Sequence, residues 1–181
     1  MVNERMDDAQ FSQILQEGES ALIEFKESLS DSLVKAIVAF SNTAGGKIFI
    51  GVNDNNTVIG YHLTNKDKSQ IQNIGNNCDP PIPLQMSSFM YHNKEIAVIE
   101  VAESRDKPVV CSDGFYLRRG ANSQKMSREE IFYYAEKTGK IRFESQLRDD
   151  FNYPNDFDPT KFDGILKNMN ITKTSTDDNI L

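Results

Sequence analysis

The chain has 181 residues, which suits one domain with an appendage, and 38% of them are hydrophobic and 26% charged, as in ordinary globular proteins. No run approaches the roughly 18 apolar residues of a membrane span, and the polar N-terminus is not a secretory signal, so we expect a cytoplasmic protein without a membrane partner. The net charge of −7 counts against tight non-specific binding of nucleic acid, but residues 105–142 hold nine basic and five acidic side chains, net +4, which permits a local basic face.

Apolar periodicity and turn residues predict the helices and strands in chain order. The helices are expected at residues 8–17, from Ser30 or Asp31 to Thr43, and at 67–77, 127–137 and 159–169. The strands are expected at residues 21–26, 47–52 with a hairpin return at 58–60, 84–91, 95–101 and 115–118.

Strands cluster in the middle of the chain, with helices before and after them. This order predicts an α+β fold with a mixed or antiparallel sheet and helices packed mainly on one side. Residues 1–143 are expected to form the domain. Residues 144–181 turn polar and rich in turn residues, so we expect a linker and the start of a following region, and we interpret the chain as a fragment of a longer protein.

Cysteine and histidine are too sparse for a disulfide framework or a zinc site. Cys78 and Cys111 are far apart and lack metal-ligand spacing, and the same holds for His62 and His92. We expect both cysteines to be free thiols in a reducing compartment.

Three carboxylates are candidates for a hard-cation site. Glu24 lies on the strand face opposite Ile23 and Phe25, Glu19 stands at the entry of that strand, and Asp54 follows the next strand. Oxygen ligands of this kind suit magnesium or manganese. The alternative, which spacing alone favours, is that these are solvated charges at a strand edge.

The end of the second helix carries a glycine turn. Asn42 and Thr43 can close the helix by bonding local backbone, and Gly45 and Gly46 permit the tight exit. Phosphate binding by the turn amides is an alternative. The segment is not a P-loop, because Lys47 is not followed by serine or threonine and the helix precedes the glycines.

A third segment, residues 116–123, suits contact with a phosphate backbone. It joins two arginines to a glycine and to polar donors, and Tyr116 could stack on a base. The equally supported alternative is that Arg118 pairs with Glu24 or Glu19 while Arg119 is solvated. The candidate nucleic-acid-binding residues are Lys26, Lys47, Tyr116, Arg118, Arg119, Asn122, Ser123, Lys125 and Arg128.

Taken in order, these segments resemble the Schlafen-AlbA domain family. The resemblance rests on an ordered set of motifs that spans about residues 11–135. They are Glu19-x-x-x-x-Glu24-Phe25-Lys26, Ala39-Phe40-x-Asn42-Thr43-x-Gly45-Gly46, Ile50-Gly51-Val52-x-Asp54, Lys107-Pro108 and Tyr116-x-Arg118-x-Gly120-x-x-Ser123.

The resemblance implies an α+β domain related to the Alba chromatin proteins, standing at the N-terminus of bacterial transcriptional regulators. We therefore expect a homodimeric nucleic-acid-binding module, for DNA more than RNA, with no cofactor. Whether it is an enzyme stays open, with the absence of activity favoured.

Two alternatives stay open. One is a metal-dependent ribonuclease like the vertebrate Schlafen proteins, whose three central acids fall by motif position on Glu19, Glu24 and Asp54 with magnesium or manganese. Asn53 stands where the family carries an acid, which weakens this alternative. The other is a nucleotide-binding or dimerisation scaffold, although the missing P-loop does not support the family's older label as a divergent ATPase.

Overall fold

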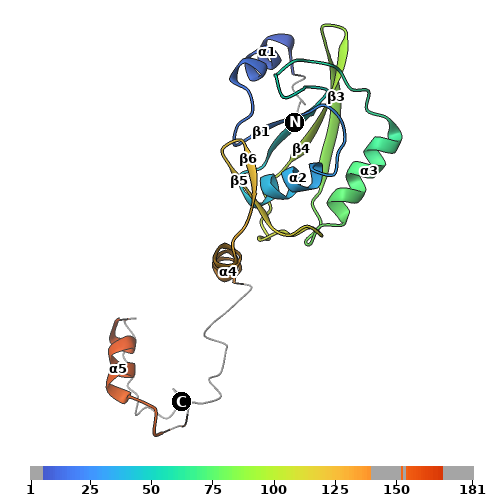
Figure 1. Ribbon diagram of the computed structural model, residues 1–181. Helices are drawn as coiled ribbons and strands as arrows, with labels where there is room; N and C mark the ends of the chain where they lie inside the picture. The colour runs from blue at the N-terminus through green and yellow to red at the C-terminus, as the bar shows by residue number, and fades with distance from the viewer. Residues whose placement is uncertain (1–5, 140–151, 153, 169–181) are drawn as a thin grey trace. The chain divides into compact units, whose positions relative to one another are not determined.

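The computed structural model describes residues 6–139, 152 and 154–168, which fall in two compact units, residues 1–141 and 142–181. The first unit is an α+β domain (Figure 1), as the sequence predicts. Its elements are α1 (Asp8–Glu17), β1 (Ile23–Lys26), α2 (Leu33–Asn42), β2 (Gly46–Ile50), α3 (Asn65–Asn76), β3 (Leu84–Tyr91), β4 (Lys94–Val101), β5 (Tyr116–Arg119), β6 (Asn122–Lys125) and α4 (Arg128–Lys137). The second unit has one described helix, α5 (Pro159–Asn168). The boundary expected at residue 143 and the last apolar position of that helix, Met169, lie outside the described residues.

The main sheet is mixed and has the strand order β1-β2-β4-β3. β1 and β2 run parallel because α2 crosses over between them, whereas β4 is antiparallel to both β2 and β3. The turn between β3 and β4 has two residues, His92 and Asn93, with positive φ angles of 45° and 63°. It is one residue shorter than the connection over 92–94 that the sequence predicts, because β4 begins at Lys94. β5 and β6 form a separate antiparallel pair.

Helices cover the two faces of the sheet unequally. Ile48 and Ile50 of β2 point into the larger core, which α2 and α3 close with side chains such as Ile37 and Ile71. Phe49 points to the opposite face, where Phe11 of α1 packs on it with ring centroids 5.2 Å apart. This confirms a sheet covered by helices mainly on one side (Figure 1). Within the described ranges, no helix combines the length and apolarity needed to cross a membrane.

Local capping explains most helix starts. α1 and α4 match the predicted bounds, and each begins with a complete capping box, as does α3. α3 begins two residues earlier than predicted because Thr64 is its cap. α2 begins after Ser32, which makes no side-chain cap bond, so the cap expected at Ser30 or Asp31 is wrong.

The strand predictions differ from the structure in several places. The strand expected at residues 21–26 begins only at Ile23, and the one expected at 47–52 ends at Ile50. The expected hairpin return at residues 58–60 is reduced to a single bridge between Val52 and Val58. Gly51 explains the break, because it has a φ of +107° and a Cβ there would lie 2.8 Å from the carbonyl carbon of Gly60. β6 was not predicted, since its four residues are all polar and lack the apolar alternation of a strand.

Candidate nucleic-acid interface

Arg118 of β5 lies at the centre of the motif residues and is buried. Its side chain is 0% exposed, and its guanidinium carbon lies 4.7 Å over the centroid of the Phe40 ring. All five of its N–H groups donate hydrogen bonds within the protein, so none remains for a phosphate. The phosphate contact predicted for Arg118 is therefore wrong, and the alternative, an ion pair with Glu24, is confirmed. The acceptors are Ser20 O for Nε (3.1 Å), Glu24 Oε2 (2.5 Å) and Ser123 Oγ (3.2 Å) for Nη1, and Ser20 O (2.9 Å) and Ile23 O (2.8 Å) for Nη2.

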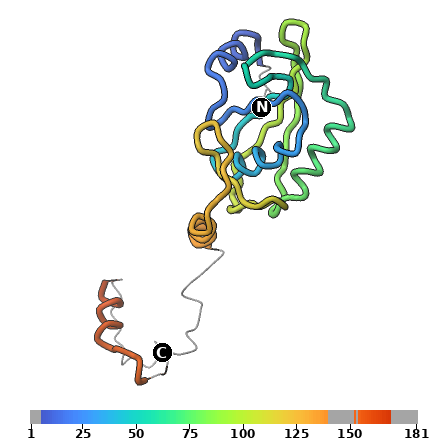
Figure 2. Tube along the Cα trace, viewed as in Figure 1, coloured from blue at the N-terminus to red at the C-terminus, as the bar shows by residue number. Residues whose placement is uncertain are grey.

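This bonding attaches the β5–β6 hairpin to the start of β1. Figure 2 shows the hairpin, in yellow to orange, beside the blue segment that leads from α1 into β1. Segments almost 100 residues apart in sequence therefore meet at one side chain.

The three candidate metal ligands have separate roles in the structure. Both carboxylate oxygens of Glu24 are occupied, Oε1 by Lys26 Nζ at 2.5 Å and Oε2 by Arg118. Glu19 Oε1 accepts a hydrogen bond from the Phe25 amide at 2.8 Å, and Asp54 is exposed in the turn after β2. Across the part of the chain that the structure describes, no three acidic, histidine or cysteine side chains form a group that could hold a metal ion. The structure thus does not gather these three carboxylates into a metal site.

Asn42 and Thr43 connect the end of α2 to the segments around it. Asn42 is fully buried, its Oδ1 accepts a hydrogen bond from the Val109 amide at 2.7 Å, and its Nδ2 donates to the carbonyls of Val109 (2.8 Å) and Tyr116 (3.1 Å). Thr43 Oγ1 accepts a hydrogen bond from the Arg118 amide at 3.0 Å. These bonds position the strand that carries Arg118.

The glycine turn is a packing device in this structure. A Cβ at Gly45 would lie 2.6 Å from the Val101 carbonyl oxygen, and one at Gly46 would lie 2.5 Å from the Phe40 ring. The amide of Gly45 donates to the Phe40 carbonyl at 2.9 Å, and that of Lys47 donates to the Leu22 carbonyl at 2.8 Å. Because these two amides are already bonded to carbonyls, they are not free to bind a phosphate.

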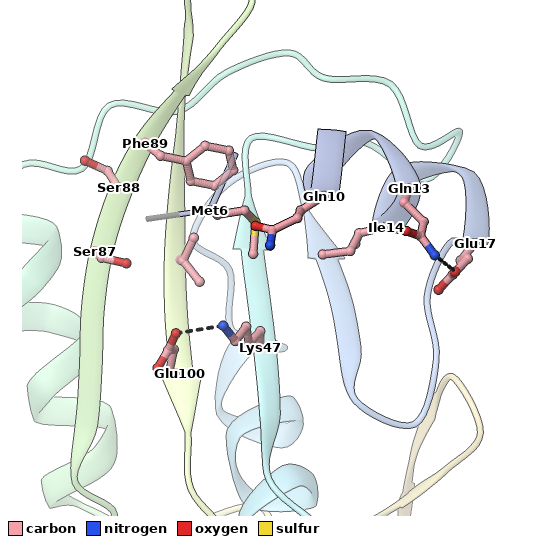
Figure 3. Close-up of a pocket in the computed structure, with 11 residues that line it drawn as sticks. Met6, Gln10, Gln13, Ile14, Glu17, Lys47, Ser87, Ser88, Phe89 and Glu100 are labelled. Carbon is pink, nitrogen blue, oxygen red and sulfur yellow. Dashed lines mark hydrogen bonds and ion pairs between the residues drawn. The ribbon is translucent and has the colours of Figure 1, made fainter. Parts of the chain in front are cut away.

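Other candidate nucleic-acid-binding residues lie inside the fold or in ion pairs. Tyr116 is 8% exposed and belongs to the core, so its predicted role in base stacking is corrected to core packing. Lys26 is paired with Glu24. Lys47 reaches across from β2 to Glu100 on β4 at 3.0 Å, in a cavity of about 490 Å³ between α1 and the sheet (Figure 3).

The remaining candidates are at the surface. Arg119, Asn122 and Lys125 are exposed on the β5–β6 hairpin, and Arg128 is exposed at the start of α4. Arg119 pairs with Glu130, and Arg128 lies 3.6 Å from the adjacent Glu129. Exposed pairs of this kind are weak, typically about 0–1 kcal/mol, so a stronger anion can displace them.

The domain also carries a basic cleft. It is an open cavity of about 580 Å³ whose walls come from the loop after β4 and the C-terminal end of α4. Its lining residues are Glu103, Ser104, Arg105, Lys107, Tyr134, Lys137 and Thr138. The Lys107 ammonium is held by Glu103 at 2.5 Å and by the Thr43 carbonyl at 2.8 Å, and the Thr138 hydroxyl lies 2.8 Å from the Lys107 carbonyl oxygen.

Three cations against one carboxylate give this cleft a positive charge. The candidate binding residues predicted from the sequence do not include Arg105, Lys107 or Lys137. Two features of the sequence point to these cations, the basic stretch of residues 105–142 and the Lys107-Pro108 motif. Neither feature indicates that Lys137 lines the same cavity as Arg105 and Lys107.

Comparison with known proteins assigns the domain. Residues 19–127 match the family model of Schlafen, AlbA_2. A curated relative, "Uncharacterized ATP-binding protein UU034" of Ureaplasma parvum serovar 3, is 29% identical in an alignment of 152 residues, and the match covers 71% of this chain and 41% of that protein. The chain therefore spans less than half the length of that relative.

Two solved structures resemble the chain, both at 18% identity. The DIP2311 protein of Corynebacterium diphtheriae has a TM-score of 0.52 over 72% of this chain and 28% of that chain. The N-terminal domain of "Putative ATP-dependent DNA helicase RecG-related Protein" of Nitrosomonas europaea has a TM-score of 0.49 over 81% of this chain and 97% of that one. Since the family model matches more than half of the residues, the chain belongs to the Schlafen AlbA_2 family.

Proposed function

We propose that this chain is a nucleic-acid-binding module of a larger transcriptional regulator, and that the basic cleft holds the phosphates of its ligand. The observation that carries the proposal is the meeting of Arg105, Lys107 and Lys137 in one cavity. Lysine and arginine side chains are the usual partners of phosphate oxygens. A local site of this kind is compatible with the acidic charge of the whole chain, because phosphates are bound by nearby cations.

Exposed aromatic side chains on α4, the helix that lines one wall of the cleft, support the same function. Phe132 and Tyr133 on α4 are 52% and 56% exposed, and the ammonium of Lys137 lies 5.7 Å from the Tyr133 ring centroid. Aromatic faces beside cations suit base stacking on single strands. Tyr133 thus takes the stacking role that we expected of Tyr116.

Removing two cleft cations should weaken binding and reduce its salt dependence. For Arg105→Ala/Lys137→Ala we expect about tenfold or greater loss of affinity at low salt, since each charged hydrogen bond to phosphate contributes roughly 1.5–3 kcal/mol. The slope of log K against log salt should fall by about 1.4–1.8 for two lost phosphate contacts. Fluorescence anisotropy with DNA and RNA oligonucleotides of one sequence, in single- and double-stranded form, measures both quantities and should show tighter binding of DNA.

The matched control is Lys66→Ala/Lys68→Ala, which removes two exposed cations from α3, outside the cleft. We expect the control to keep most of the wild-type affinity and slope. Equal losses in the two double variants would contradict a local site, and no binding of any oligonucleotide at about 50 mM salt would contradict the proposed function.

We also propose that the module forms a homodimer through the edge strand β3. This strand has eight residues, stands at the end of the sheet order, and carries no charged side chain that would discourage strand pairing. Met90 on this strand is 59% exposed. Light scattering should give a dimer for the wild type and a monomer for Met90→Lys; a monomeric wild type would contradict the proposal.

A further inference from the structure

The two cysteines, distant in sequence, are cross-strand neighbours in the fold. Asp79 and Val110 form an isolated antiparallel bridge, in which the Asp79 amide donates to the Val110 carbonyl at 2.9 Å and the Val110 amide donates to the Asp79 carbonyl at 2.8 Å. The next pair outward consists of Cys78 and Cys111. In an antiparallel ladder, residues opposite each other project their side chains to the same face.

The spacing of such a pair fits a disulfide. A pair next to a doubly hydrogen-bonded one is the narrow kind, with Cα atoms about 4.5 Å apart. Disulfides connect residues whose Cα atoms are roughly 4.4–6.8 Å apart. Cys78 and Cys111 also belong to the same buried core cluster, which agrees with this placement.

Both sulfur atoms lie in buried surroundings. Cys78 is 4% exposed and Cys111 is 7% exposed, and their sulfur atoms lie 3.3 Å from the carbonyl oxygens of Ile74 and Gly114. Burial, together with the nearby Cys111 sulfur, raises the pKa of Cys78 to about 11. Because the thiolate is the nucleophile in thiol chemistry, attack by Cys78 is slow at neutral pH and faster at alkaline pH.

We propose that Cys78 and Cys111 are a modification site that forms a reversible intramolecular disulfide with a low-molecular-weight disulfide as oxidant. One cysteine thiolate attacks the reagent, a mixed disulfide forms, and one small thiolate leaves. The second cysteine thiolate attacks the protein sulfur of the mixed disulfide and releases the other small thiolate. Two protein thiols are oxidised, the reagent is reduced to two thiols, and the two cysteine protons pass to them.

The crosslink would connect the segment after α3 to the segment before β5. It closes a loop over residues 79–110, which contains β3, β4 and two cations of the basic cleft, Arg105 and Lys107. A closed loop restricts the unfolded chain, so oxidation is expected to stabilise the domain. This inference does not depend on the proposed function, since it rests on the Asp79–Val110 bridge and on the placement of both cysteines in one core cluster.

Incubating the full chain with oxidised glutathione at about pH 9 tests the site, because thiolates are more abundant there. We expect the intact mass to fall by two hydrogen atoms, a digest to contain one crosslinked peptide with Cys78 and Cys111, and dithiothreitol to reverse both. The thermal midpoint should rise by roughly 5–10 °C on oxidation. Cys78→Ala and Cys111→Ala are the controls, and each should stop at a glutathione adduct without that rise.

Wild-type protein that ends with two glutathione adducts, with a disulfide-linked dimer, or with both thiols unmodified would overturn the proposal. The wild-type mass and digest decide the outcome even if a single variant folds poorly.

Discussion

Truncation of Glu24 to alanine is expected to lower the free energy of unfolding by about 3–5 kcal/mol. The variant would leave the Arg118 guanidinium buried without a counter-charge, and an unpaired buried charge carries a penalty of that size. The pair is well shielded, since the side chains of Arg118 and Glu24 are 0% and 9% exposed. Urea unfolding of wild type and variant measures the difference.

Glu27→Ala is the matched control for this prediction. It removes an acid directly after β1 that is exposed, so we expect a change within about 0.5 kcal/mol. The comparison also separates a structural Glu24 from a catalytic one. If Glu24→Ala is as stable as Glu27→Ala but abolishes a manganese-dependent cleavage of RNA, Glu24 belongs to a nuclease centre and the structural interpretation is wrong.

Local signals in the sequence were sufficient for much of the fold. The capping residues of α1 and α4 lie within three residues of the groups they bind, so both helices could be predicted from neighbours alone. The alternation of β4 likewise follows from its own residues. β6 could not be found in this way, because its polar residues form a strand only through their register with β5.

The roles of charged residues depend on contacts that no local pattern contains. Arg118 meets Glu24 across 94 positions, so the sequence left an ion pair and a phosphate contact equally supported. Lys137 meets Arg105 only because the end of α4 returns to the loop after β4. Candidate cations could be counted from the sequence, but which of them gather in one cavity depends on the tertiary fold.

The motif residues that carried the resemblance act mainly as structural ties. Glu24 anchors Arg118, the glycines permit close packing of the turn, and Asn42 holds the segment before β5. These roles explain why an ordered set of motifs predicted the fold correctly. The same motifs indicate less about the chemistry of the domain, because their side chains largely form hydrogen bonds and ion pairs within the protein.

Asn42→Leu is therefore expected to be strongly destabilising, by roughly 2–5 kcal/mol. Leucine has a similar size, but it would bury the Val109 amide and the carbonyls of Val109 and Tyr116 without partners, and each unsatisfied group costs about 1–3 kcal/mol. Urea unfolding measures the loss, and faster hydrogen exchange at the Val109 amide would locate it. Asn76→Leu, at the exposed end of α3, is the control.

The same substitution tests whether the fold and the proposed site are linked. Val109 lies two residues after Lys107, so a loosened segment should displace one wall of the basic cleft. Nucleic-acid affinity should fall for Asn42→Leu although no cation has been removed. Unchanged affinity and unchanged exchange at Val109 would mean that the Asn42 contacts do not position the cleft, and that its cations are held in place by α4 and the Thr43 carbonyl instead.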